Sequence, residues 1–399
     1  METTERRKRK NKFLLSVLRL LLPYRMAAIL LRKTSRNSQR KVAFASAKAM
    51  VKEMENWKEF GFDRAGLSAE SEELARVTAV HKERYELVCR QGSCYGRLKA
   101  SRYFDSLTET FPTVGDFVEL QYNPAGDSVI LHTLPRRTFF SRLDPAPGHP
   151  VEQAVAANFD TVFVVQSLNE NFNVNRLERY LAQAWQSGAR PVVVLTKADL
   201  PGDHSGEILA AQETAPGVEV IPVSAKTGQG LELLSPYLQP GETLVFLGSS
   251  GVGKSSLLNA LAGEELMATG AVRESDSRGR HTTTHRQLFC LPCGALVIDT
   301  PGMRELGMWD VSEGLGEAFP DVEELAKRCR FSDCRHESEP GCAVQEALRQ
   351  GTLSPQRWKS YQQLQREAIF TGKKEDVRRM RQMKKSAERR HRLRKKYDR

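Results

Sequence analysis

The sequence predicts a multidomain α/β protein, and three observations carry this prediction. Short β-rich runs separated by turn residues occupy residues 85–142, which indicates a small all-β unit. Continuous apolar runs then alternate with a helical pattern between residues 160 and 302, as is typical of a parallel sheet covered on both faces. Three cysteines and a histidine follow within residues 329–342, beside helical stretches at 343–350 and 354–370.

The charge distribution separates the two ends of the chain from its body. The 399 residues have a net charge of +11, but residues 1–56 hold 15 Lys/Arg against 4 Asp/Glu and residues 371–399 hold 14 against 4. The body between them therefore carries 31 basic and 41 acidic residues. We expect the basic tail at 371–399 to bind RNA and to become ordered on it.

The first 56 residues form a basic, partly apolar extension. Its apolar stretch at 13–31 is interrupted by Arg19, Pro23 and Arg25, so it falls short of the roughly 20 apolar residues that a membrane span needs. We interpret the segment before about Met50 or Met54 as an upstream extension outside the folded protein. A basic amphipathic helix at a membrane or ribosome surface is one alternative, and a signal peptide is another.

The elements are predicted from the spacing of apolar and turn residues. The β-rich unit comprises the runs RYELVC, CYGRLKA, DFVELQY and SVILHTL, and the Pro/Gly segment at 143–150 is expected to be a linker. A helix is predicted at 174–188, closed by Gly188. Further strands are predicted at 160–168, 191–199, 218–226, 243–248 and 295–302.

A phosphate-binding loop lies between a strand and a helix. The segment GSSGVGKS matches the pattern G-x-x-x-x-G-K-[ST], in which glycines let backbone N–H groups surround phosphates at a helix N-terminus. Lys254 would reach the β- and γ-phosphates, and the Ser255 hydroxyl would bind Mg²⁺. The candidate residues of this loop are Gly248, Ser249, Ser250, Gly251, Val252, Gly253, Lys254, Ser255 and Ser256.

Two further motifs predict that the base is guanine. The TKAD segment ends a strand, and the Asp199 carboxylate can accept hydrogen bonds from guanine N1–H and N2–H₂ together. In the SAK segment, the Ala225 N–H would meet guanine O6. The candidate base-binding residues are Thr196, Lys197, Asp199, Ser224, Ala225 and Lys226.

The remaining nucleotide motifs follow the phosphate loop. In GRHTTT, Thr283 is expected to bind Mg²⁺; in DTPG, Asp299 would hold Mg²⁺ through water and the Gly302 N–H would meet the γ-phosphate. In Ras-like GTPases the base motifs come last, whereas here they come first. A circular permutation explains this order, because the pocket needs only adjacent strand ends.

The Cys/His segment predicts a structural zinc site. Cys329, Cys334, His336 and Cys342 supply three thiolates and an imidazole within 14 residues, a closed tetrahedral set. Cys290 and Cys293 lie in a predicted hairpin with no further ligand nearby in sequence, and we interpret them as ordinary thiols.

The combination of TKAD, SAKTGQG, GSSGVGKSSL, GRHTTT, DTPGMRELG and CRFSDCRHESEPGC resembles the circularly permuted, ribosome small-subunit-dependent GTPases of the RsgA (YjeQ/YloQ) family. The resemblance covers about residues 80–370. It implies an OB-fold at 72–145, the permuted GTPase domain at 150–318 and a helical zinc domain at 319–370.

The resemblance also implies partners and a catalytic residue. It predicts a cytoplasmic, monomeric enzyme that binds GTP, GDP, Mg²⁺ and one Zn²⁺, without stable membrane association. It would act on the small ribosomal subunit and its rRNA, late in maturation, with hydrolysis stimulated by the subunit. Met303 stands where Ras-like enzymes have a water-orienting Gln, and similar enzymes use a switch-loop histidine, which is His281 here.

The sequence leaves two alternative functions undecided, and it also leaves undecided whether one face of the β-rich unit binds RNA. The protein could instead be a nucleotide-regulated RNA-binding or signalling module with incidental hydrolysis, or a membrane-associated GTPase. OB-folds bind RNA through their loops and one sheet face, although an ordinary solvated strand face is an equal alternative. The candidate contacts are Arg84, Tyr95, Arg97, Lys99, Arg102 and Tyr103.

Overall fold

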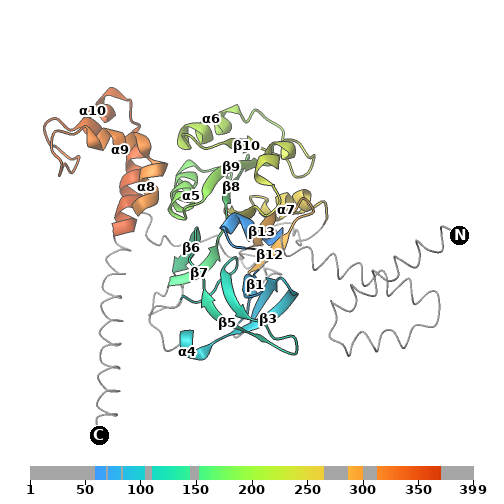
Figure 1. Cartoon of the computed structure of the whole chain (residues 1–399). Helices are drawn as coiled ribbons and strands as arrows, with labels where there is room; N and C mark the ends of the chain where they lie inside the picture. Colours follow the sequence, from blue (N-terminus) through green and yellow to red (C-terminus); the bar gives the residue numbers. More distant parts are fainter. Residues whose placement is uncertain are drawn as a thin grey trace, which may run out of the picture. The chain divides into compact units, whose positions relative to one another are not determined.

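The computed structural model describes residues 59–68, 71–81, 84–103, 110–143, 152–264, 286–299 and 312–369. All of them belong to one compact unit, Trp57–Arg399. Figure 1 shows three regions within it: a small barrel, a central sheet with helices, and a group of C-terminal helices. The predicted extension at 1–56 and the tail at 371–399 lie outside the described residues, and the domain boundaries stay predictions.

The first region is a five-stranded barrel with the strand arrangement of an OB-fold. Antiparallel pairing joins β1 to β2 and β2 to β3, β3 runs parallel to β5, and β5 pairs with β4. Pairing of β4 with β1 closes the barrel, which confirms the expected OB-fold. The strand β1 precedes the runs that the sequence singled out. The elements are β1 (Leu74–Val80), β2 (Tyr85–Cys89), β3 (Gly92–Leu98), α4 (Ala100–Tyr103), β4 (Phe117–Gln121) and β5 (Ser128–Thr133).

A two-stranded antiparallel ribbon follows the barrel. It consists of β6 (Phe139–Leu143) and β7 (Glu152–Ala157), paired from Phe139↔Ala157 to Leu143↔Glu152. The predicted linker at 143–150 lies, apart from Leu143 at the end of β6, outside the described residues. Phe140 on β6 stacks on Phe159, with ring centroids 4.8 Å apart, so the ribbon packs on the central region.

The central region is the predicted parallel sheet. Its strand order is β10-β9-β8-β11-β13, all parallel, with β12 antiparallel beside β13. Every residue of β8 and β11 is buried, as expected for strands covered on both faces. The elements are β8 (Thr161–Ser167), α5 (Val174–Gln186), β9 (Arg190–Thr196), α6 (Ser205–Thr214), β10 (Val220–Pro222), η3 (Leu231–Tyr237), β11 (Thr243–Leu247), α7 (Lys254–Ala262), β12 (Gln287–Cys290) and β13 (Leu296–Asp299).

The barrel and the central sheet form one hydrogen-bonded sheet. Strand β12 pairs with β1 at Gln287↔Ala79, which joins the two regions edge to edge. Beside this junction, the guanidinium of Arg76 is 1% exposed and donates to the carbonyls of Phe60, Gly115 and Asn158 at 2.7, 3.2 and 2.8 Å. Arg76 therefore joins the segment before the barrel, the barrel itself and the central region through buried backbone groups.

The C-terminal helices dock on α5. The Gly314 N–H donates to Gln186 Oε1 at 2.7 Å, and a Cβ at Gly314 would lie 2.1 Å from the Ala182 carbonyl, so only glycine fits this contact. Arg357 donates to Glu178 on α5 at 3.2 Å and to both carboxylate oxygens of Asp321 at 2.7 Å. The helices are α8 (Ser312–Ala318), α9 (Pro320–Lys327), α10 (Ala343–Gln350) and a helix at 355–369. The last two were predicted, whereas α8 and α9 were not.

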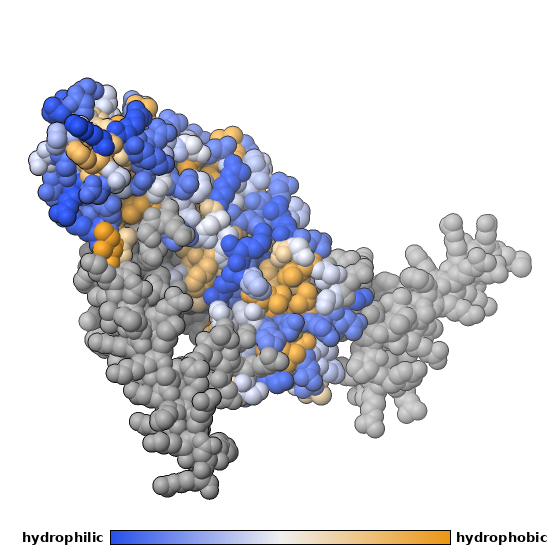
Figure 2. Space-filling model, turned by 60° about the vertical axis from the view of Figure 1, so that its left-hand side comes forward, coloured by the Kyte–Doolittle hydropathy of each residue, from blue (hydrophilic) through white to orange (hydrophobic). Residues whose placement is uncertain are grey.

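The surface is mixed in polarity. Figure 2 shows hydrophilic residues over most of the described surface in that view, with hydrophobic residues in small groups. Among the residues that the structure describes, no helix has the length and hydrophobicity needed to cross a membrane.

Candidate functional site

The phosphate loop lies at the carboxyl end of β11, between β8 and β13 in the sheet. Gly248 packs against β8 so closely that a Cβ would be 2.5 Å from the Val165 carbonyl. Gly253, the N-cap residue just before α7, has a left-handed φ of 93°, which side chains disfavour. The loop therefore needs glycine at both ends to turn from the strand into the helix, and it presents backbone N–H groups at the N-terminus of α7.

Lys254 lies folded over this loop. Its ammonium donates to the carbonyls of Gly248 and Ser249 at 2.5 and 2.7 Å, so the positive charge is held beside the loop backbone. Ser255 and Ser256 follow in the first turn of α7. An ammonium at this position can bind a phosphate anion that the loop N–H groups surround.

The end of β9 is bonded to the phosphate loop. The Thr196 hydroxyl lies within hydrogen-bond distance of the Gln166 carbonyl, at 3.2 Å, and also contacts the Val252 carbonyl in the loop. The following residue, Lys197, has a left-handed φ of 64°. This conformation turns the chain sharply after the strand, where the base-binding motif begins. Gln166 and Thr196 thus fix the loop relative to two strand ends, a role that the motif alone did not indicate for Gln166.

Asp199 is positioned by Ser224 of the second base motif. The Ser224 hydroxyl donates to Asp199 Oδ1 at 2.7 Å and accepts from the N–H groups of Lys226 and Thr227 at 3.2 and 3.1 Å. The hydrogen bond from Ser224 is the main cause that holds the pKa of Asp199 below its usual value, with the charge of Lys226 assisting. A preoriented, ionised carboxylate at the carboxyl edge of the sheet can accept two hydrogen bonds from a base.

The structure thus brings the two base motifs and the phosphate loop to one sheet edge. Thr196, Asp199 and Ser224 are linked to one another or to the loop by the contacts above. Asp299 is the last residue of β13, next to β11, and nothing of its side chain is described. The predicted site residues His281, Thr283 and Gly302 lie outside the described residues.

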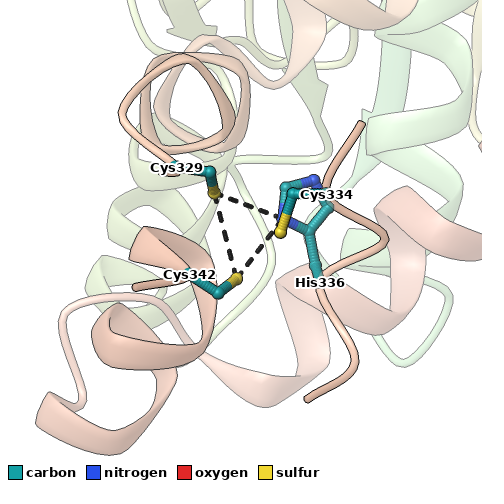
Figure 3. Close-up of side chains that lie close together, drawn as sticks. All are labelled: Cys329, Cys334, His336 and Cys342. Carbon is teal, nitrogen blue, oxygen red and sulfur yellow. Dashed lines mark hydrogen bonds between the residues drawn. The ribbon is translucent and has the colours of Figure 1, made fainter. Parts of the chain in front are cut away.

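The second candidate site is the Cys/His cluster between α9 and α10 (Figure 3). The ligand atoms of Cys329, Cys334, His336 and Cys342 all lie within 4.8 Å of one another. His336 Nδ1 is 3.5 Å from the sulfurs of both Cys329 and Cys342, and these two sulfurs are 3.9 Å apart. Tetrahedral zinc, with Zn–S about 2.3 Å and Zn–N about 2.0 Å, requires S–S and S–N separations of about 3.8 and 3.5 Å. The four residues form a donor set typical of structural zinc, and the separations among Cys329, His336 and Cys342 match this geometry.

The protein backbone preorganises this cluster. Glu339 accepts from the N–H groups of Arg335, Glu337 and Ser338, and these bonds lower its pKa to about 2. Cys342 is the N-cap residue of α10, and its sulfur accepts from the Gln345 N–H at 3.4 Å. Burial opposes charge on Cys329, but backbone N–H groups at the start of α10 outweigh it and hold the pKa of this thiol below its usual value. A thiolate, the form that binds metal, is thus favoured there.

Two sequence predictions concern residues outside these sites. Cys290 is the last residue of β12 and Cys293 lies in the turn before β13, so the predicted hairpin is confirmed. Among the described residues, the Cys329–Cys342 cluster is the one group of three or more His, Cys, Asp or Glu side chains that could hold a metal ion.

The prediction of Tyr103 as an RNA contact was wrong. Its ring is 2% exposed because α4 turns it into the barrel, where its hydroxyl lies 2.9 Å from Thr133 Oγ1.

Comparison with known proteins agrees with this geometry. A family model described as RsgA GTPase matches residues 133–309. The protein "Small ribosomal subunit biogenesis GTPase RsgA 1" of Listeria innocua is 47% identical over 313 residues, which are 78% of this chain and 88% of the relative.

Two solved structures share the fold. The crystal structure of YjeQ from Thermotoga maritima is 28% identical with a TM-score of 0.57, and the alignment covers 74% of this chain and 98% of that one. The structure of YloQ, described as a circularly permuted GTPase, is 26% identical with a TM-score of 0.55, over 76% of this chain and 96% of that one. The predicted circular permutation is thereby confirmed, and the chain belongs to the RsgA GTPase family.

Proposed function

We propose that this protein hydrolyses GTP on the small ribosomal subunit and acts in the maturation of that subunit. The proposal rests on one observation, the arrangement of the phosphate loop and the hydrogen-bonded Asp199–Ser224 pair at one edge of the sheet. It is supported by 47% identity to a small ribosomal subunit biogenesis GTPase. In this proposal the protein works as a cytoplasmic monomer, and the GTP- and GDP-bound forms differ in their affinity for the subunit.

Each part of the site has a role in this mechanism. The N–H groups of the phosphate loop surround the β-phosphate, and Lys254 moves from the loop carbonyls to the β- and γ-phosphates. Asp199 accepts from the guanine N1–H and N2–H₂ groups, with Lys197 along the base and the Ala225 N–H at O6. Ser255, Thr283 and Asp299 would hold Mg²⁺, which supplies charge neutralisation during phosphoryl transfer. Cys329, Cys334, His336 and Cys342 would hold one structural zinc.

The base assignment is tested with Asp199→Asn. An asparagine replaces one acceptor oxygen by a donor, so two charge-assisted hydrogen bonds to guanine are lost or weakened. We expect GTP affinity to fall by about 100-fold or more, with ATP affinity unchanged, both measured by calorimetry. The matched control is Asp203→Asn on the following loop, where Asp203 accepts from the Ser205 N–H at 2.9 Å. Equal GTP affinity of Asp199→Asn and the control would contradict the assignment.

The catalytic step is tested with His281→Ala. We propose that the His281 imidazole positions the attacking water when the subunit is bound, because Met303 cannot do so by hydrogen bonding. GTP turnover of the wild type should rise at least about tenfold when purified small subunits are added. In His281→Ala the stimulated rate should fall by about 100-fold, while GTP affinity stays the same. A wild type without stimulation contradicts the proposed function, whereas an unchanged stimulated rate in the variant contradicts only the role of His281.

A further inference from the structure

Two cysteines of the barrel form a sulfur pair in the β2–β3 hairpin. Cys89 is the last residue of β2, and Cys94 lies in β3. In the antiparallel pairing Cys89 is opposite Gly92 and Cys94 is opposite Leu87, so the two cysteines are diagonal neighbours on one face of the hairpin. Their sulfurs are 3.9 Å apart. The register of the hairpin therefore brings two thiols into contact.

The face that carries the two thiols is turned toward the barrel core. Cys89 is 0% exposed and belongs to this core together with Leu87 and Ile130. Its sulfur also lies 3.2 Å from the Gly92 carbonyl oxygen. Cys94 packs against the same core but is partly exposed. One thiol is thus enclosed by apolar neighbours, while the other lies at the edge of the core and is partly open to solvent.

The two thiols also differ in acidity. The hydrogen bond with Cys89 is the main cause that holds the pKa of Cys94 below its usual value, and a hydrogen bond from Ser128 assists. The Ser128 hydroxyl accepts from the Asn123 N–H at 3.1 Å, which leaves its own proton for the Cys94 sulfur. The same bond with Cys94, together with burial, raises the pKa of Cys89. Cys94 is therefore the thiol that forms the reactive thiolate, and Cys89 keeps its proton.

The other described cysteines are placed differently. Burial raises the pKa of Cys290 to about 11, and the nearby Glu59 carboxylate assists. Cys293 is exposed in the turn before β13. The remaining three thiols belong to the Cys/His cluster, where they would hold zinc. Cys89 and Cys94 thus form a dithiol that neither the nucleotide site nor the zinc site uses.

We propose that Cys89 and Cys94 are a site of reversible oxidation, at which a hydroperoxide converts the two thiols into a disulfide within the barrel. In the first step the Cys94 thiolate attacks one oxygen of hydrogen peroxide, the O–O bond breaks, hydroxide leaves and Cys94 becomes a sulfenic acid. In the second step the Cys89 sulfur attacks the Cys94 sulfur, the S–O bond breaks, and the leaving hydroxide takes the Cys89 proton to form water. A dithiol reductant reverses the reaction by thiol–disulfide exchange.

The geometry and the chemistry of the pair both suit this reaction. A disulfide has an S–S distance of about 2.05 Å, so the two sulfurs must approach by about 1.9 Å, and both are carried by adjacent strands of one hairpin. Disulfides in reducing compartments are mostly transient and redox-sensing, and a low-pKa, accessible cysteine beside a second thiol is their common form. Neither GTP nor the small subunit takes part, so the reaction is independent of the proposed function.

The experiment uses the full-length protein, hydrogen peroxide and trypsin. Arg90 lies between the two cysteines, so trypsin separates them into the peptides 85–90 and 91–97 unless a disulfide links these peptides. After peroxide treatment and alkylation of free thiols, mass spectrometry should show the loss of both alkylated peptides. In their place should be one linked species, lighter than the two thiol peptides together by two hydrogens. Dithiothreitol added before alkylation should restore both alkylated peptides.

Two serine variants separate the roles of the two sulfurs. In Cys89→Ser the Cys94 sulfenic acid has no partner thiol, so the sulfenic acid reagent dimedone should label peptide 91–97 after peroxide treatment. In Cys94→Ser the peptide 85–90 should stay unlabelled by dimedone, because Cys89 is buried and protonated. The matched control is Cys293→Ser, which removes an exposed thiol outside the pair and should form the linked peptides as the wild type does.

Absence of the linked peptides in peroxide-treated wild type overturns the inference. A link from Cys89 or Cys94 to any other cysteine also overturns it, and so does a link found only in the dimer band of a non-reducing gel. Dimedone labelling of Cys89 in Cys94→Ser, or none of Cys94 in Cys89→Ser, contradicts the assigned order of the two steps. The wild-type measurement needs no substitution, so it decides even where a variant fails to fold.

Discussion

Cys342→Ser is expected to abolish zinc binding and to release the segment between α9 and α10. Among residues 328–342 only Cys342 is buried, so apolar packing alone gives this loop little support. A structural zinc contributes on the order of 10 kcal/mol in small metal-dependent folds. Elemental analysis of the purified wild type should give about one zinc per chain and that of the variant less than about 0.1.

The consequences of zinc loss should stay local. Hydrogen exchange should lose protection across α9, α10 and the helix at 355–369, because Trp358 packs edge-on against His336 with centroids 5.7 Å apart. Protection of β8, β9 and β11 should persist, along with GTP affinity. The control is Cys293→Ser, an exposed thiol outside the cluster. Zinc retained in Cys342→Ser, or zinc lost in Cys293→Ser, would show that the ligand set is wrong.

Arg76→Ala is expected to cause the largest loss of stability from a single side chain at the barrel junction. Burial lowers the pKa of Arg76 to about 10, so the group is still charged at pH 7 and its bonds are charge-assisted. The substitution leaves three carbonyls without this donor and opens a cavity beside Phe117, whose ring centroid is 4.8 Å from the guanidinium. We expect the free energy of unfolding to fall by about 3–5 kcal/mol in denaturant titrations.

The control for Arg76 is Arg137→Ala. Arg137 is 43% exposed on its side chain and pairs with Asp160 at 3.2 Å, so its removal should cost less than about 1 kcal/mol. The free energy of unfolding of Arg76→Lys should be closer to that of Arg76→Ala than to that of the wild type. One ammonium cannot replace a planar guanidinium that reaches three carbonyls at once. A change below about 1 kcal/mol in Arg76→Ala would contradict the role of this residue in joining the two regions.

The parts of the fold that could be predicted are those with local sequence patterns. The buried strands β8, β9 and β11 are continuous apolar runs, and the site motifs stand at strand ends where only a few residue types fit. Strand β1 was missed because Arg76 interrupts its apolar pattern, and an arginine in a strand normally indicates a solvent-facing position. Its burial depends on Phe60 and Asn158, which are 16 and 82 residues away.

The helices that were missed have weak local signals for a similar reason. The sequence does not predict α8, because its segment SEGLGEA has two glycines in seven residues and glycine disfavours helix formation. Gly314 is needed there because α8 approaches the α5 backbone, which is a tertiary contact. Tyr103 was misassigned because the alternation of exposed residues along β3 stops where α4 begins. In each case the deciding contact is distant in sequence, so the local pattern could not contain it.

The β12–β1 pairing has a consequence for how the enzyme would approach its target. The barrel and the nucleotide-binding sheet share hydrogen bonds and are joined by Arg76. Once the barrel is bound to the small subunit, the orientation of the sheet edge that carries the phosphate loop and the base motifs would therefore be set as well. The C-terminal helices are instead attached largely through side chains, such as Arg357 with Glu178 and Arg179 with Glu367. A bound barrel would therefore act as the fixed reference point, and adjustment between nucleotide states would fall to the zinc-binding end of the molecule.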